Sequence, residues 1–232
     1  MIYAMERKNK KKQAVLSCFT LIELITVIVI MAFIMAIGIP AFSGMFKGQA
    51  IGNSTATVAQ LLKLSRNYAI ANHAYVAVII PQKGYPSTGL PDSYYNTALR
   101  PALVKYESGN KPFKLYKWID GESWTLLQPG TAILEYDDDN TEVKGSPKIG
   151  YCPVVSDVDF SDIEQGGGAK KVSNVSAVIF KYDGTAFSKN ENNFTIDVGQ
   201  GIITPKGLKI ISKGKPIQIE ISTETGMIFI DR

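Results

Sequence analysis

The sequence predicts an α+β protein in which a long N-terminal helix, partly transmembrane, packs on antiparallel β-sheets. A nearly uninterrupted apolar run from Leu24 to Phe42 is ~19 residues long, and as a helix it spans roughly 28 Å, about the hydrocarbon thickness of a bilayer. From residue 75 onward, short segments rich in β-branched and aromatic residues alternate with Gly, Pro, Asn and Asp turns, a pattern typical of strands. The 232 residues suffice for one such domain and an anchor.

A basic leader precedes the apolar run. Residues 1–18 hold five Lys and Arg and one Glu, so they account for the whole net charge of +4 and leave 20 basic and 20 acidic side chains elsewhere. Basic residues keep their end of a membrane anchor in the cytoplasm. The rest of the chain is neutral, so we expect no nucleic-acid binding, and we interpret Trp118 and Trp124 as strand core rather than as base-stacking platforms.

Residues 19–47 are predicted to form the transmembrane and assembly helix. Gly38 and Pro40 lie near its far end. Proline removes a backbone hydrogen bond and clashes with the preceding turn, so we expect a helix kink at these two residues. An ordinary secretory signal does not fit, because its apolar core is only about 7–15 residues long.

Residues 48–232 are predicted to form an extracytoplasmic globular domain. The apolar pattern relaxes at Gly48–Gly52, and Ser54 is a candidate N-cap for a second helical segment at 54–72. One face of that segment is apolar at spacings of three and four residues, which indicates core packing. The sequence thus predicts one long, interrupted helix followed by strands, with His73 at its end.

The strands are expected at short intervals, with an antiparallel meander from 102 to 136 and a tight turn at Asp183–Gly184. Residues 82–97 contain two prolines and two glycines, and we interpret them as a long exposed loop in which Tyr94 and Tyr95 are solvated. The expected strands cover 75–80, 102–107, 113–119, 123–127, 131–136, 149–155, 175–182, 185–188, 194–198, 216–222 and 226–230.

No constellation of catalytic residues is visible, so we expect a protein that is not an enzyme and that needs no cofactor. His73 is the only histidine, which excludes His-based triads and multi-His metal sites. Gly166–Gly168 does not lie between a strand and a helix, as a phosphate-binding loop requires. The aspartates of 157–162 supply oxygen ligands that calcium accepts, but they lack the spacing of a known calcium loop, and the same holds for Asp137–Asp139. We therefore expect no metal site.

Between the leader and the apolar run, Cys18 is followed by Phe19-Thr20-Leu21-Ile22-Glu23. This N-terminus resembles that of type IV prepilins and of the pseudopilins of type II secretion. Their pattern is a short basic leader, a small residue before the cleavage site, the word Phe-Thr-Leu-Ile-Glu and a long apolar helix. Here the word runs from Phe19 to Glu23 and follows Cys18, where the family usually has Gly. Cysteine is also small, so cleavage is still expected, and Cys152 then remains as a single cysteine without an intramolecular disulfide partner.

This resemblance implies roles for three residues. Prepilin peptidase would cut between Cys18 and Phe19, and the same enzyme would methylate the new α-amine of Phe19. The Glu23 carboxylate would then pair with that amine on a neighbouring subunit and set the register between subunits, because leaving either charge unpaired in a low-dielectric setting is costly. The alternative is a glutamate at the membrane interface with no such partner.

The resemblance extends to the H-type minor pseudopilin of type II secretion and its minor-pilin relative (GspH/FimT). It implies a pilin-like fold, a helix laid against two antiparallel sheets. Residues 82–100 and 140–172 look like insertions relative to that pattern. The segments that carry the similarity are 61–70, 76–78, Trp124, 179–184 and 219–228.

The implied protein is a minor pilin or pseudopilin of the bacterial inner membrane, single-pass, with a cytoplasmic N-terminus and a periplasmic C-terminal domain. Its partners would be prepilin peptidase/N-methyltransferase, other pilin or pseudopilin subunits, the inner-membrane assembly platform and membrane lipid, and it would join a filament. An alternative is an uncleaved single-pass anchor that displays a β-rich binding domain. A membrane-tethered enzyme lacks any candidate catalytic group.

Overall fold

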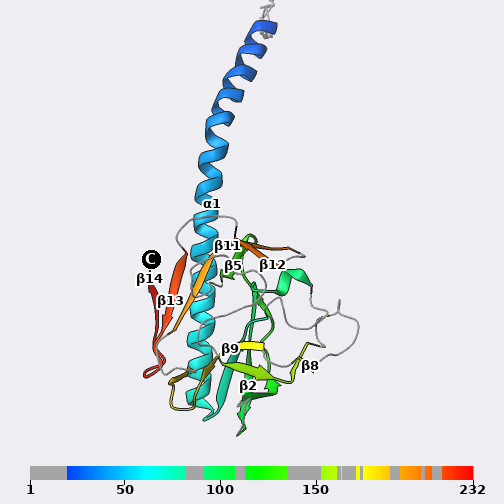
Figure 1. Cartoon of the computed structure of the whole chain (residues 1–232). Helices are drawn as coiled ribbons and strands as arrows, with labels where there is room; N and C mark the ends of the chain where they lie inside the picture. The colour runs from blue at the N-terminus through cyan, green and yellow to red at the C-terminus, as the bar shows by residue number, and fades with distance from the viewer. Residues whose placement is uncertain are drawn as a thin grey trace, which may run out of the picture. The chain divides into compact units, whose positions relative to one another are not determined.

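A computed structural model describes residues 20–81, 91–107, 113–134, 153–160, 163, 171–172, 175–188, 194–204, 207–210 and 216–231 (Figure 1). The chain divides into two units, Met1–Gly44 and Met45–Arg232, which we treat separately. The elements are α1 (Leu21–Ala71), β1 (Tyr75–Ile79), η1 (Asp92–Tyr94), β2 (Ala98–Tyr106), β3 (Phe113–Trp118), β4 (Thr125–Leu126), β5 (Thr131–Leu134), β6 (Val154–Ser156), β7 (Val158–Asp159), β8 (Lys171–Val172), β9 (Val175–Phe180), β10 (Ala186–Phe187), β11 (Phe194–Thr204), β12 (Gly207–Ile210), β13 (Ile217–Ile221) and β14 (Ile228–Asp231).

The helix α1 is a single element of 51 residues, which corrects the interruption expected at Gly48–Gly52. Glycine in a helix interior costs about 1 kcal/mol relative to alanine, and two glycines are not enough to end a helix whose later turns are held by packing. A Cβ on either Gly48 or Gly52 would meet nothing within 4 Å, so neither glycine is required by a close contact.

Ser54 is not an N-cap, because it lies inside α1 and is fully buried. Its Oγ lies 2.7 Å from Thr131 Oγ1 and accepts the backbone N–H of Gln128 at 3.0 Å. Thr131 in turn donates to the Gln128 carbonyl at 2.6 Å. A capping serine satisfies a helix N–H, whereas this one joins the helix to the turn before β5. Ser54, predicted as a cap, therefore makes tertiary hydrogen bonds instead.

The larger sheet closes on itself. β1 pairs with β2 and with β9, β2 pairs with β3, β3 pairs with β6, and β6 pairs with β9. All of these pairings are antiparallel except β3–β6, which is parallel. Two short strands extend this closed sheet: β4 pairs with β2, and β10 pairs with β9.

Strands β1 and β9 are buried on both faces, because one face points into this closed sheet and the other toward α1. Ala77 and Ile79 belong to the core inside the closed sheet, together with Phe113 and Val155 from other strands. Val76 and Val78 alternate with them and belong to the core beneath α1. Burial on both faces explains why the sequence of β1 is a continuous apolar run rather than an alternation of apolar and polar residues.

The second sheet is fully antiparallel and has the order β12-β11-β13-β14, with β5 also paired to β11. The long strand β11 lies between β5 and β13 in its first half and pairs with β12 in its second half. A third, two-stranded sheet joins β7 to β8. The chain is therefore α+β with mostly antiparallel sheets, as the sequence predicts.

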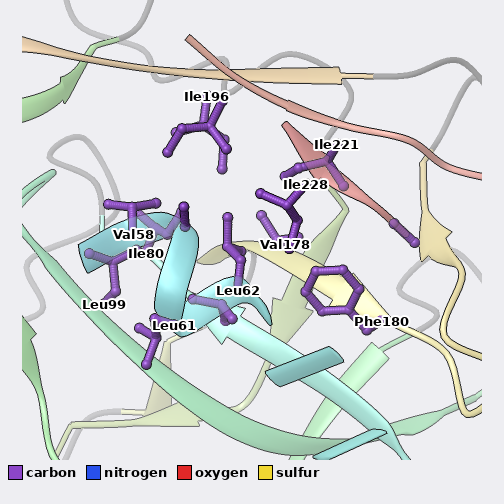
Figure 2. Packing of buried hydrophobic residues seen from close by; sticks show 14 of the residues in the cluster. Val58, Leu61, Leu62, Ile80, Leu99, Val178, Phe180, Ile196, Ile221 and Ile228 are labelled. Atoms are coloured by element: carbon purple, nitrogen blue, oxygen red, sulfur yellow. The ribbon is translucent and has the colours of Figure 1, made fainter. Parts of the chain in front are cut away.

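The core beneath α1 takes side chains from the helix and from both large sheets. Figure 2 shows Val58, Leu61 and Leu62 of α1 among residues of the closed sheet and of the second sheet. The helix contributes the apolar stripe that the sequence indicates at 54–72, and Val58 and Leu62 are fully buried. The labelled partners in Figure 2 are Ile80, Leu99, Val178, Phe180, Ile196, Ile221 and Ile228.

The meander expected from 102 to 136 is wrong beyond β3. β4 pairs with β2 instead of β3, and β5 joins the second sheet through β11. Turn signals mark where strands end but not which partner they take, because pairing depends on which apolar face must be covered. Strands β7, β8 and β12 lie where the sequence predicted none.

The loop before β2 is only partly exposed, which corrects the prediction of solvated tyrosines. Tyr95 is 8% exposed, and Tyr94 packs its ring against Trp124 with centroids 6.0 Å apart. The neighbouring Asn96 is buried, and its side-chain nitrogen donates to the Ile133 carbonyl at 3.1 Å. This loop therefore joins the two large sheets, since Ile133 belongs to β5.

Candidate assembly segment and the contacts that support the domain

The N-terminal part of α1 has the length and composition of a membrane span. Leu21–Ile39 is 19 residues long, near the N-terminus, with a mean hydropathy of 2.7. Its large apolar side chains are exposed throughout, from Ile25 at 47% to Leu21 at 78%. A helix that is apolar on all sides must be covered by lipid or by other helices.

Thr20 and Glu23 form a capping box at the start of α1. Glu23 Oε2 accepts hydrogen bonds from the Thr20 backbone N–H and from Thr20 Oγ1, both at 2.8 Å. In return, the Glu23 backbone N–H donates to Thr20 Oγ1 at 3.3 Å. Such a reciprocal pair satisfies backbone donors that the first helical turn leaves free.

The capping box gives Glu23 a role within its own chain that the sequence analysis missed. The signal was present, since Thr followed three residues later by Glu, ahead of an apolar run, is the pattern of such a cap. Both hydrogen bonds that the Glu23 side chain accepts end on Oε2. The Thr26 hydroxyl donates to the Ile22 carbonyl rather than to Glu23. The pairing of Glu23 with a neighbouring subunit stays a prediction.

The other predicted site residues of this segment lie at or beyond its ends. Cys18 and Phe19, the expected cleavage and methylation site, fall outside the described residues. Gly38 and Pro40 are both within α1, whose helical assignment continues through them. The kink expected at Gly38 and Pro40 stays a prediction.

Arg66 ties α1 to two hairpins of the second unit. Its Nε donates to the Gly184 carbonyl at 2.9 Å, and its Nη2 donates to the Thr225 carbonyl at 2.8 Å. Gly184 lies in the turn between β9 and β10, and Thr225 lies in the turn between β13 and β14. The planar guanidinium supplies diverging donors, which suits one side chain that bridges two loops.

The two turns that Arg66 joins contact each other through their glycines. Gly226 has φ +63°, and a Cβ built on it would lie 1.9 Å from the Gly184 carbonyl oxygen. Gly184 has φ +85°, and a Cβ there would lie 2.8 Å from Ile70 Cδ1. Only glycine fits both the left-handed backbone and the close approach at Gly226.

His73 ends α1 as the sequence predicts, and it does so in a Schellman motif. The His73 N–H donates to the Ile70 carbonyl at 3.4 Å, and the Ala74 N–H donates to the Ala69 carbonyl at 3.1 Å. His73 takes φ +48° at the position where glycine is commonest. The histidine is therefore a helix terminator here.

The acidic turn at 157 is engaged by a lysine. Asp157 Oδ2 lies 2.9 Å from Lys114 Nζ, a pair that also raises the pKa of Lys114 above its usual range. Within the described part of the chain, no three His, Cys, Asp or Glu side chains are grouped closely enough to hold a metal ion. Asp162, Gly166–Gly168 and Asp137–Asp139 fall outside that part.

Trp118 and Trp124 form an aromatic cluster with an arginine. Their rings are 5.4 Å apart, and the Arg100 guanidinium lies 4.4 Å from the ring centroid of Trp118. Trp124 also stacks on Phe160 at 5.7 Å. The rings are used for packing and for a cation–π contact, in line with the interpretation as core, although Trp124 itself precedes β4.

Comparison with known proteins adds one structural similarity. No protein-family model matches the sequence, and no curated protein matches it either. Among solved structures, the chain is similar to the crystal structure of the type IV minor pilin FimU of Pseudomonas aeruginosa, with a TM-score of 0.36 and 11% sequence identity. That similarity covers 82% of this chain and 91% of the FimU chain.

Proposed function

We propose that this protein is a prepilin-type minor pseudopilin or pilin subunit, processed before Phe19 and assembled into a type II secretion pseudopilus or a type IV pilus. The observation that carries the proposal is the N-terminal segment: an exposed apolar helix, Leu21–Ile39, that begins with a Thr20–Glu23 capping box inside the word Phe-Thr-Leu-Ile-Glu. Its role would be mechanical, to prime or cap a filament.

The chemistry of this segment supports stacking in a membrane-derived filament. A helix with apolar side chains all round can exchange lipid contacts for contacts with equivalent helices at little cost, because both surroundings are apolar. A charge near its start then decides the register, since only one axial offset brings it opposite a partner. Glu23 is the only acidic residue of the span, and it uses one carboxylate oxygen for its own cap.

The N-terminus of the protein purified from its own cells tests the processing step. Intact-mass and peptide mass spectrometry should find a chain that starts at N-methylated Phe19. An intact leader at residues 1–18 would contradict the proposal and favour the uncleaved anchor with a β-rich binding domain. Restoring the usual family residue with Cys18→Gly should leave the site of cleavage unchanged and provides the matched control.

Two substitutions separate the cap from the pairing between subunits. Glu23→Gln retains a capping box, because glutamine also reaches the N-cap backbone, but it removes the charge that would meet the Phe19 amine. Thr20→Val removes the cap hydroxyl and keeps the charge. We expect Glu23→Gln to abolish recovery of the protein in sheared filament fractions, and Thr20→Val to reduce it only modestly. Normal assembly of Glu23→Gln would eliminate the pairing.

A further inference from the structure

A groove of about 300 Å³ lies between α1 and the last strand of the second sheet. Lys63, Arg66 and Asn67 line it from the helix, and the segment from Gly226 to Phe229 lines it from the other side. Its volume is at the lower end of that of small-molecule pockets, and one wall is a strand, which suits an extended chain better than a compact ligand.

Among the strands that the structure describes, the one on this wall is the edge of its sheet. β14 pairs with β13 on one side, and it ends the order β12-β11-β13-β14. The Ser222 N–H donates to the Met227 carbonyl at 3.0 Å, which fixes the alternation along the hairpin. The backbone groups of Phe229 therefore face β13, and those of Ile228 and Ile230 face away from it. The outward groups of an edge strand are a template for another strand.

The groove is apolar on the strand side and positive on the helix side. Met227 is 52% exposed and Phe229 is 53% exposed. Both are large apolar side chains, and covering them with another apolar surface is favourable. Arg66 donates to two neutral carbonyls, so its charge is not neutralised there, and Lys63 is exposed nearby. None of the described residues that line the groove carries a carboxylate.

We propose that this groove binds an extended segment of another protein by adding it as a strand to β14. The segment would alternate apolar side chains, which cover Met227 and Phe229, with carboxylates, which face Lys63 and Arg66. Backbone hydrogen bonds to residues 228 and 230 would supply affinity, and the alternating side chains would supply specificity. The site is independent of the membrane span, and it does not require that the protein assemble into a filament.

A second copy of the chain fits this groove less well. Antiparallel pairing of β14 with its own symmetry mate places the same face of each molecule at the interface. The lysine and arginine of one copy would then approach those of the other, and like charges at close range oppose association. An acidic strand removes this repulsion and adds attraction.

Binding is measured on the full chain in detergent micelles with a labelled probe. The probe is an acetylated, fluorescein-labelled hexapeptide of alternating valine and glutamate, followed by fluorescence anisotropy. The same peptide with lysine in place of glutamate is the matched control. We expect the acidic probe to bind at least about tenfold more tightly than the basic one at low salt, and the difference to shrink at high salt.

Two variants test the strand and the charge separately. Ile230→Pro deletes an outward N–H without removing a bond to β13, and it should abolish binding of the acidic probe, whereas Ile230→Ala should retain it. Lys63→Glu should weaken binding about fivefold or more. Equal binding of the two peptides, or unchanged binding by Ile230→Pro, would overturn the proposal. So would a dimer in sedimentation that Ile230→Pro dissociates, since it would assign the edge to a second copy.

Discussion

Arg66 Nε donates a hydrogen bond of 2.9 Å to the carbonyl oxygen of Gly184, a residue 118 positions further along the chain. The same guanidinium reaches Thr225, 159 positions away, at 2.8 Å. Helix α1 is thereby joined to the ends of two hairpins from different sheets, at a point where the turns contact each other through Gly226. Apolar packing has no preferred direction, whereas a hydrogen bond does. The Arg66 hydrogen bonds therefore set the position of the two hairpin ends relative to the helix.

Replacing Arg66 should lower the stability of the globular unit. Arg66→Ala removes two hydrogen bonds from a charged donor to carbonyl groups, one of them part-buried, and we expect a loss of about 1–3 kcal/mol in the free energy of unfolding. Arg66→Lys should recover less than half of it, because an ammonium does not bridge two diverging acceptors. Urea denaturation followed by circular dichroism measures this, with exposed Lys63→Ala as the control. A loss for Lys63→Ala as large as that for Arg66→Ala would refute it.

Gly226→Ala should be more damaging than a glycine substitution at an open turn. The new methyl group would need to occupy a position 1.9 Å from the Gly184 carbonyl oxygen, so the two turns must separate. Gly121 is a matched control, with φ +85° and no atom within 4 Å of the place that a Cβ would take, so Gly121→Ala pays only the backbone cost of about 1–2 kcal/mol. We expect Gly226→Ala to cost at least about 1 kcal/mol more, measured by thermal unfolding. Equal shifts of the melting temperature would contradict the close approach.

Leu62 and Leu64 provide a test of which helix face is buried. Leu62 is fully buried in the core of Figure 2, and Leu64 is 41% exposed. Leu62→Ala should cost about 2–5 kcal/mol, since it leaves a cavity, whereas Leu64→Ala should cost less than about 1 kcal/mol. Chemical denaturation of both variants measures the difference. Similar values would mean that α1 packs on a different face.

Features that depend on local sequence pattern were predictable, whereas the partners of the strands were not. The apolar stripe at 54–72, the strand after His73 and the hairpin at Asp183–Gly184 are all present, because each is set by periodicity or by a turn residue. The partner of β5 is not local information. It follows from which backbone edge of β11 remains unpaired once β13 has paired, so the meander prediction failed.

The candidate sites also differ in whether a local sequence pattern marks them. The Thr20–Glu23 cap has a readable sequence spacing and was available to prediction. Arg66 has no such signal, since an arginine on a helix is usually solvated and its two acceptors are backbone carbonyls of remote turns. The groove beside β14 also depends on knowing that the last strand is an edge, which only the strand order reveals.

Removal of the Asp197 charge should stabilise the protein near neutral pH. Asp197 lies on β11 opposite Leu134 and Gln218, and its Oδ1 is buried without a hydrogen-bond partner among the described residues. Burial raises the pKa of this carboxyl above its usual value of 3.8, and a hydrogen bond with Gln218 opposes the shift only in part. The folded state therefore holds this proton more tightly than the unfolded chain does.

The direction of the pH dependence follows from that difference in proton binding. The stability that the neutral carboxyl contributes is complete below the unfolded pKa of 3.8 and is lost as the pH rises through the higher pKa of the folded state. Asp197→Asn should thus raise the urea midpoint at pH 7 and lose that advantage at pH 3. Asp183 serves as the opposite case, because hydrogen bonds from the Thr185 hydroxyl and N–H lower its pKa. Asp183→Asn should lower the urea midpoint at pH 7 and approach the midpoint of the unsubstituted protein at pH 3. If Asp197→Asn also lowered the midpoint at pH 7, the Asp197 carboxylate would be stabilised by the fold rather than penalised by burial, and the prediction would be wrong.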